Sequence, residues 1–243
     1  MAKPEPLFAE YHCVSCKTPF ISPFPLDEDG RCALCRLGAS GFDDAYSFGF
    51  YQDELRQLVQ LFKYSKIQTL AAPLGRLLAL ALPRGLRFDV IVPMPMHWRK
   101  RWQRGFNQAE LLAREIARRT NLPVRNAVKR VHQKSVQAGL TNAKRRANVA
   151  GAFRPRRGKT LEGKRVLLID DVMTTGATAS ACAKALKRAG AARVTLLTVA
   201  RVDRRIVSVD YKVSDVAGRS RPDAAFAEST FPRSLDAKSG SFA

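Results

Sequence analysis

Two adjacent carboxylates, Asp170 and Asp171, stand between an apolar run and a loop of small hydroxyl residues. The apolar run at 166–169 predicts a buried strand, and the Ala-rich stretch after the loop predicts a helix. A helix N-terminus offers free N–H groups and the positive end of its dipole, and glycine allows close approach, so this loop suits a phosphate monoester. The candidate phosphate-binding residues are Thr174, Thr175, Gly176, Ala177 and Thr178.

The two carboxylates restrict which phosphate the loop can take. Negative groups repel a bare phosphate unless they contact sugar hydroxyls or a divalent cation that the ligand shares. A sugar phosphate with a vicinal diol therefore fits better than a simple anion. The chain contains neither G-x-x-x-x-G-K-[ST] nor G-x-G-x-x-G, which disfavours nucleoside triphosphatases and dinucleotide-binding proteins. The alternative interpretation is a strand and turn without a ligand, in which Thr174 caps the helix.

A group of cations follows a second apolar run, at 89–93, which predicts a strand that ends in a stiff loop. Loops at the carboxyl ends of neighbouring parallel strands face the same crevice. These cations should therefore meet whatever lies beyond the phosphate of the sugar, and one or two of them should clamp an anionic leaving group. Arg104 is the candidate clamp. The other candidate ligand-binding residues of this segment are Met94, Arg99 and Lys100.

The positive charge of the chain is concentrated in its middle. Lys and Arg total 42 against 21 Asp and Glu, a formal net charge of +21, and residues 99–157 hold 17 basic and two acidic residues. Such a local field favours a polyanion, either a pyrophosphate or a nucleic-acid backbone. Aromatic residues interleaved with the charge, such as Trp98 and Trp102, suit stacking on a single strand. The alternative is a solvated basic face. The candidate DNA-binding residues are Arg101, Arg145 and Arg146.

Four of the five cysteines form two C-x2-C pairs separated by 15 residues: Cys13 and Cys16, then Cys32 and Cys35. Two such pairs can place four thiolates around one tetrahedral ion, so the spacing predicts a structural Zn²⁺ site. Zinc binding would contribute on the order of 10–16 kcal/mol at neutral pH, enough to fold a short segment that lacks a core. Disulfides in a secreted protein are the alternative. Cys182 stands apart and is interpreted as a small buried hydrophobe.

The patterns along the chain divide it into three parts. Residues 1–45 are rich in Pro, Gly and Asp and form a small module that needs a staple. Residues 46–202 alternate apolar strands with helical stripes, which is typical of a parallel sheet covered by helices on both faces. Asn107 should cap the helix that follows it. Residues 133–153 have the composition of a mobile lid. Residues 203–243 predict an edge strand at 206–213 and a disordered tail. No signal-peptide pattern or run of 18 apolar residues occurs, so we expect a cytoplasmic protein without membrane insertion.

Residues 166–178 resemble the phosphoribosyl pyrophosphate signature of the type I phosphoribosyltransferases. The resemblance implies an α/β fold of that type, in which Asp170 and Asp171 meet the ribose hydroxyls and residues 174–178 wrap the 5′-phosphate, with Mg²⁺ bound beside the ligand. Several further features together resemble the ComF family of competence and DNA-utilisation proteins over residues 13–201. These features are R-G-F-N-Q at 104–108, Gln137 with Leu140, Arg146 with Asn148, Phe153 and the four cysteines of a zinc ribbon.

Three functions follow from these patterns. The ComF resemblance implies a phosphoribosyl pyrophosphate-binding protein of DNA uptake, with single-stranded DNA and a helicase-like ATPase as partners. The second function is an active phosphoribosyltransferase of nucleotide metabolism, with Asp170, Asp171 and Arg104 as catalytic residues, although no segment is recognisable as a hood for a base. The third is a zinc adaptor whose transferase-like domain is vestigial; intact acids and an intact phosphate loop argue against it.

Overall fold

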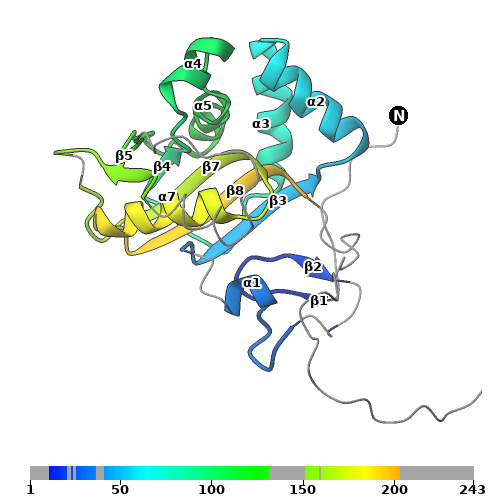
Figure 1. The fold of residues 1–243 in the computed structure, drawn as a ribbon, viewed down its shortest axis with the longest axis vertical. Helices are drawn as coiled ribbons and strands as arrows, with labels where there is room; N and C mark the ends of the chain where they lie inside the picture. The colour runs from blue at the N-terminus through cyan, green and yellow to red at the C-terminus, as the bar shows by residue number, and fades with distance from the viewer. Residues whose placement is uncertain are drawn as a thin grey trace, which may run out of the picture. The chain divides into compact units, whose positions relative to one another are not determined.

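The computed structural model of the 243-residue chain describes residues 11–20, 23, 26–36, 41–131, 151–158 and 160–202 (Figure 1). Its centre is a four-stranded sheet in the order β3-β8-β7-β4, in which all neighbouring strands are parallel. The strands are β3 (Asp44–Phe50), β4 (Val90–Pro93), β7 (Arg165–Met173) and β8 (Arg193–Arg201). The predicted parallel sheet is therefore confirmed.

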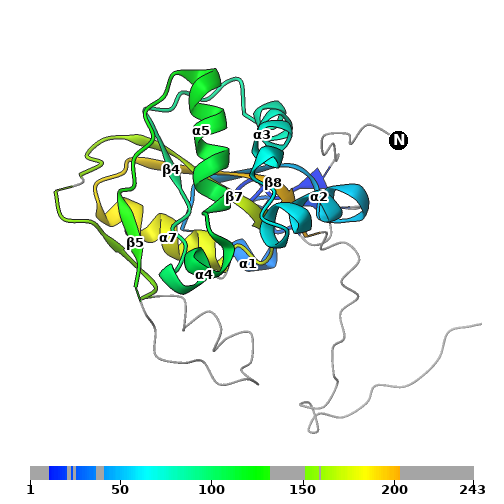
Figure 2. The ribbon, with the colours of Figure 1, turned by 90° about the horizontal axis from the view of Figure 1, so that it is seen from above.

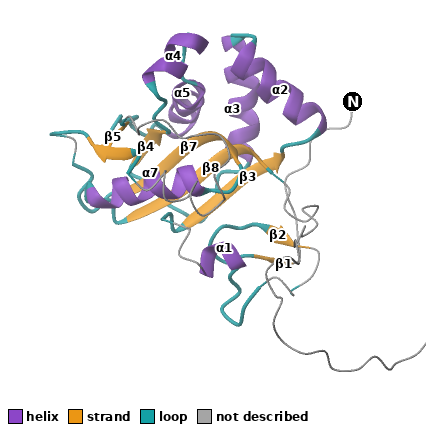
Figure 3. Ribbon diagram, in the orientation of Figure 1, coloured by secondary structure: helices purple, strands orange, loops and turns teal. Residues whose placement is uncertain are grey.

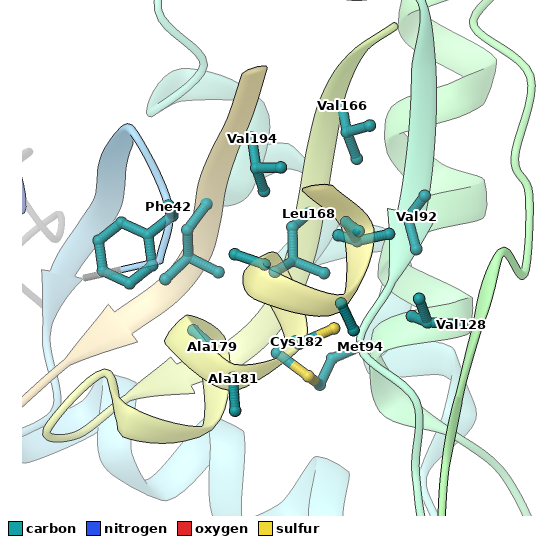
Figure 4. Packing of buried hydrophobic residues seen from close by; sticks show 14 of the residues in the cluster. Phe42, Val92, Met94, Val128, Val166, Leu168, Ala179, Ala181, Cys182 and Val194 are labelled. Carbon is teal, nitrogen blue, oxygen red and sulfur yellow. The ribbon is translucent and has the colours of Figure 1, made fainter. Parts of the chain in front are cut away.

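Helices cover both faces of this sheet, as Figures 1 and 2 show. The helices are α1 (Ala33–Arg36), α2 (Asp53–Tyr64), the 3-10 helix η1 (Gln68–Leu70), α3 (Ala71–Leu80), α4 (Trp98–Arg104), α5 (Gln108–Thr120) and α7 (Ala177–Arg188). Figure 3 distinguishes the helices from the strands. Alternate residues of β7 face opposite ways: Leu167 and Ile169 pack with α2, α3 and α5, whereas Val166 and Leu168 pack with α7 (Figure 4).

Two small antiparallel pairs complete the described structure. Strands β1 (Tyr11–His12) and β2 (Pro19–Phe20) pair in the cysteine-containing segment, and β5 (Val128–Arg130) pairs with β6 (Phe153–Pro155). In the part of the chain that the structure describes, no helix has the length and apolarity needed to cross a membrane.

The turn between α4 and α5 fixes where the cations lie. Gly105 ends α4 with a φ of 81°, a left-handed conformation that favours glycine. The Asn107 side chain then caps α5 by accepting from the Ala109 N–H at 3.1 Å, as predicted, and its Nδ2 donates to the Met94 carbonyl at 3.0 Å. One residue therefore ties the start of α5 to the end of β4.

The structure differs from the sequence-based expectations in three places. Strand β3 was not expected, and it spans the boundary proposed at residue 45. Strand β7 continues through the acid pair to Met173, whereas the strand expected from the sequence, 164–170, ends at Asp170. The cations expected on a loop at 99–104 lie on helix α4. The edge strand at 206–213, the tail and residues 133–150 of the expected lid lie outside the described residues.

Candidate functional site

The acid pair lies where β4 and β7 end side by side. Pro93 pairs with Ile169, and the Met94 N–H donates to the Ile169 carbonyl at 2.8 Å, so Asp170 and Asp171 follow directly beyond the paired part of β4. The loops after both strands therefore leave the same edge of the sheet, as expected for parallel strands.

Asp171 forms an ion pair with the last turn of α2. Its Oδ1 lies 3.0 Å from Nζ of Lys63, and only 13% of the Asp171 side chain and 15% of the Lys63 side chain are exposed. Lys63 Nζ also lies 5.9 Å from the centre of the Tyr51 ring. One of the two predicted sugar-binding acids is thus engaged inside the protein, whereas the loop that follows it is open to solvent at Thr174 and Thr175.

Asp170 has a strongly altered acidity. Burial and then the neighbouring charge of Asp171 raise the pKa of Asp170 to about 7, against the lowering effect of the Asp171 N–H and the charges of Lys63 and Arg130. The Asp171 N–H donates to Asp170 Oδ1 at 2.9 Å. A buried carboxyl group beside a second carboxylate can keep its proton near neutrality.

The phosphate loop, residues 174–178, leads directly into α7. Gly176 is the N-cap of this helix, with a φ of 76° and no side-chain cap, so the alternative in which Thr174 caps the helix is not what the structure has. Thr175 Oγ1 accepts from the Ala177 N–H at 3.4 Å. The helix has 12 residues, and Lys187 and Arg188 occupy its last turn, where cations complement the dipole.

A cavity of about 350 Å³ lies between the end of α2 and helix α4. We call it the cation pocket; its lining residues are Lys63, Tyr64, Lys100, Gln103 and Arg104. The Arg104 guanidinium lies 5.2 Å from the centre of the Tyr64 ring and donates to Gln108 Oε1 at 3.3 Å. Burial and then the charges of Arg130, Arg104 and Lys63 lower the pKa of Lys100. The positive charge of such a site is not balanced by the residues that line it, so the site favours an anionic ligand.

Three other residues predicted from this segment, Met94, Arg99 and Arg101, do not line this pocket. Met94 is 5% exposed and belongs to the buried cluster with Cys182 (Figure 4), so its side chain is part of the core. Arg99 lies over the Trp98 ring at 5.3 Å, and Arg101 forms an ion pair with Glu110 at 2.9 Å. Arg145 and Arg146 lie outside the described residues.

Apart from Gln103 of α4, three residues of the site were not predicted from the sequence. Lys63 and Tyr64 come from the end of α2, and Arg130 from β5. Arg130 lies over the Phe153 ring at 5.5 Å, and its charge reaches both Asp170 and Lys100. No local pattern marks them, since each is a single cation or aromatic residue at the end of an element.

The four predicted metal-ligating cysteines meet at one point. Their sulfur atoms all lie within 4.8 Å of one another, and Cys16 Sγ is 3.7 Å from Cys32 Sγ. Zinc bonds of about 2.3 Å in a tetrahedron place two sulfur atoms about 3.8 Å apart, so the set fits one ion. Hydrogen bonds with Cys16, Cys32 and Cys35 lower the pKa of Cys13, whereas hydrogen bonds with Cys13, Cys16 and Cys32 raise that of Cys35. The thiols are not in disulfides, and four of them close together can hold a metal such as zinc.

The cysteine cluster is joined to the sheet through Arg201, the last residue of β8. This side chain is 2% exposed and donates to the carbonyls of Lys17 at 2.8 Å and Cys16 at 3.2 Å, and to the Thr18 hydroxyl. The Thr18 hydroxyl in turn lies 2.8 Å from Cys16 Sγ. The buried guanidinium therefore has carbonyl and hydroxyl acceptors from the first C-x2-C loop.

Comparison with known proteins agrees with this geometry. Residues 104–231 match the model of the phosphoribosyl transferase domain. The chain is 33% identical over 179 residues to Competence protein F of Haemophilus influenzae, covering 70% of this chain and 78% of that protein. It is 34% identical over 177 residues to DNA utilization protein YhgH of Escherichia coli K12, covering 70% and 77%. Competence protein ComFC of Bacillus subtilis matches at 33% over 115 residues, 46% of this chain and 44% of that protein.

The matched domain, the parallel sheet and the acid pair at its carboxyl edge define a protein of the phosphoribosyltransferase-domain class. Within that class, the chain belongs to the ComF family, the family of Competence protein F and YhgH. The family resemblance and the fold class inferred from the sequence are confirmed.

Proposed function

We propose that this chain binds phosphoribosyl pyrophosphate together with Mg²⁺ at the joint carboxyl edge of β4 and β7, and that it serves DNA uptake or utilisation in the cytoplasm. The observation that carries the proposal is the order of groups along one edge: a phosphate loop, two acids, then a pocket lined by Lys63, Lys100 and Arg104. A 5-phosphorylated sugar with a pyrophosphate has the complementary order of phosphate, diol and diphosphate.

Each end of the ligand has its own partners in this arrangement. Residues 174–178 hold the 5′-phosphate through the N–H groups and dipole of α7. Asp170 and Asp171 accept hydrogen bonds from the ribose hydroxyls. Lys100 and Arg104 contact the pyrophosphate. Mg²⁺ bound with the ligand supplies charge neutralisation.

Calorimetric titration with phosphoribosyl pyrophosphate and Mg²⁺ tests this site. Wild-type protein should bind, and Asp171→Ala should bind at least tenfold more weakly because a charged hydrogen-bond acceptor is lost. No heat in either protein would overturn the proposal and would favour a zinc adaptor with a vestigial domain. Under the proposed binding function, the four cysteines hold Zn²⁺ as an ion with a structural role only.

Single-stranded DNA is the proposed second ligand. On α4, Trp98 is 62% exposed and Trp102 is 84% exposed, and Arg101 and Arg99 lie beside them. Exposed aromatic rings among cations suit stacking of bases and contact with the backbone. We include Arg145 and Arg146 in this surface on the basis of sequence. A helicase-like ATPase of DNA uptake is the proposed protein partner.

Filter binding of an oligonucleotide at two salt concentrations tests the DNA surface. Retention should fall steeply from low to high salt as counterions are released, and Trp102→Ala should weaken it about fivefold through lost stacking. Leu80→Ala is the control, because Leu80 is 68% exposed on α3 and uncharged. Equal retention at both salt concentrations, or none, would remove DNA from the proposal.

An active phosphoribosyltransferase is the second candidate, favoured by the cation pocket beside the acids. Its reaction would pass through an oxocarbenium-like ribosyl cation as pyrophosphate leaves, so positioning and cationic clamps such as Arg104 would carry catalysis. Incubation with phosphoribosyl pyrophosphate, Mg²⁺ and a panel of purines, pyrimidines, ammonia and glutamine should then release pyrophosphate. No release with any acceptor would leave the binding function alone.

A further inference from the structure

Lys63 lies at the boundary between the acid pair and the cation pocket. Its ammonium group is 3.0 Å from Asp171 Oδ1, and the same side chain lines the pocket with Lys100 and Arg104. Both members of the ion pair are nearly buried, so water competes weakly for either charge. Lys63 thus contacts the acid that the sugar needs and faces the place proposed for the pyrophosphate.

Among the residues that the structure describes, the pocket side of Lys63 is lined by cations and neutral groups, and no acidic residue is in that lining. The lowered pKa of Lys100 reflects both burial and the crowding of positive charge. A pyrophosphate in the pocket would give Lys63 several anionic oxygens, whereas Asp171 gives it one carboxylate. The flexible four-carbon stem of lysine lets the ammonium turn from one to the other.

We propose that Lys63 makes the site selective for a sugar that carries a pyrophosphate over the same sugar with a 5′-phosphate alone. The inference rests on the proposed function of the site. In the free protein Lys63 holds Asp171; the pyrophosphate of the ligand draws Lys63 away, and Asp171 then accepts from a ribose hydroxyl. Ribose 5-phosphate brings no second anion, so its hydroxyls compete with Lys63 for Asp171.

Removal of the Lys63 charge should therefore move the two affinities in opposite directions. In calorimetric titrations with Mg²⁺, Lys63→Met should bind phosphoribosyl pyrophosphate about tenfold more weakly, because a charged hydrogen bond to the pyrophosphate is lost. The same variant should bind ribose 5-phosphate about threefold more tightly, because Asp171 is released. Arg56→Met is the matched control: Arg56 is an exposed cation on the same helix, and both affinities should stay at the wild-type values.

Two further variants separate this role from a structural one. Lys63→Arg keeps the charge and should keep the wild-type ratio of the two affinities within about threefold, and Lys63→Gln repeats the neutral variant with a polar side chain. In an Asp171→Asn background, Lys63→Met should no longer tighten ribose 5-phosphate, because there is no carboxylate to release. Thermal melting confirms that each variant is folded.

The outcomes distinguish this inference from the function on which it rests. Wild-type protein that binds no phosphoribosyl pyrophosphate would overturn the proposed function. Wild-type protein that binds it, with neutral Lys63 variants that weaken both ligands equally or leave the ratio unchanged, would overturn the selectivity role of Lys63 alone.

Discussion

The two ends of the site are built in different ways. The phosphate loop is a single stretch, residues 174–178, shaped by one left-handed residue at the start of α7. The cation pocket takes Lys63 and Tyr64 from α2 and Lys100, Gln103 and Arg104 from α4, with Arg130 of β5 acting on it through its charge. The loop therefore depends on one backbone conformation, whereas the pocket depends on how separate helices pack. A single change should disable the first and only weaken the second.

The largest effect should come from the loop end. Gly176→Val puts a β-branched residue at a φ of 76° and displaces the N–H groups of α7, so phosphoribosyl pyrophosphate and ribose 5-phosphate should each bind roughly 30- to 100-fold more weakly. Gly158→Val is the control, because Gly158 has a φ of 68° and open space around its Cβ position. Calorimetry that gives both variants the wild-type affinities would remove the loop from the site.

A change at the pocket end should affect only one ligand. Arg104→Ala should weaken phosphoribosyl pyrophosphate about tenfold through one lost charge-assisted contact and leave ribose 5-phosphate unchanged. Arg114→Ala, which removes an exposed cation from α5, is the control for net charge. If Arg104→Ala weakened both sugars by the same factor in the same titration, the two ends would not be separate.

The acids between the two ends should make binding depend on pH. Because the pKa of Asp170 is raised to about 7, its carboxyl group is mostly protonated at pH 6 and mostly ionised at pH 8. Only the ionised form accepts hydrogen bonds at both oxygens, so the affinity for ribose 5-phosphate should rise about fivefold over this interval. Asp170→Asn removes this step and keeps the titration of the ligand's own phosphate. An identical pH profile in both proteins would exclude Asp170 as the source of the pH dependence of binding.

The smallest effect should come from the Thr175 hydroxyl. It accepts a weak hydrogen bond, 3.4 Å from the Ala177 N–H, so Thr175→Ala should weaken both sugar phosphates about twofold to threefold. Thr160→Ala provides the comparison, since Thr160 Oγ1 accepts from the Glu162 N–H at 3.3 Å in another turn. A tenfold loss in Thr175→Ala would mean that this hydroxyl contacts the ligand directly.

The same contrast explains how much of the site could be predicted from the sequence. The phosphate loop and the Asn107 cap are local patterns, and the paired C-x2-C spacing predicted the sulfur cluster. Lys63 could not be predicted, because its partner Asp171 lies more than a hundred residues away and only the packing of α2 brings them together.

The fold, like the site, was predicted where the sequence carries a local pattern and was missed where it does not. Continuous apolar runs identified β4 and β7, whereas β3 was missed because its sequence D-A-Y-S-F-G-F mixes polar and aromatic residues. Met94 was proposed as a ligand-binding residue, and its side chain lies in the buried cluster just beyond the end of β4. Sequence order thus identified the edge of the sheet, and packing determined which side chains face it.

Arg201 limits where this protein can be truncated or divided into segments. Its backbone pairs in register with Met173, the residue before the phosphate loop. Its guanidinium donates hydrogen bonds to the Cys16 and Lys17 carbonyls. A truncated chain that starts after the cysteines would leave that guanidinium without its carbonyl and hydroxyl acceptors. When segments are exchanged between relatives, the cysteine-containing segment and the end of β8 should therefore be transferred together.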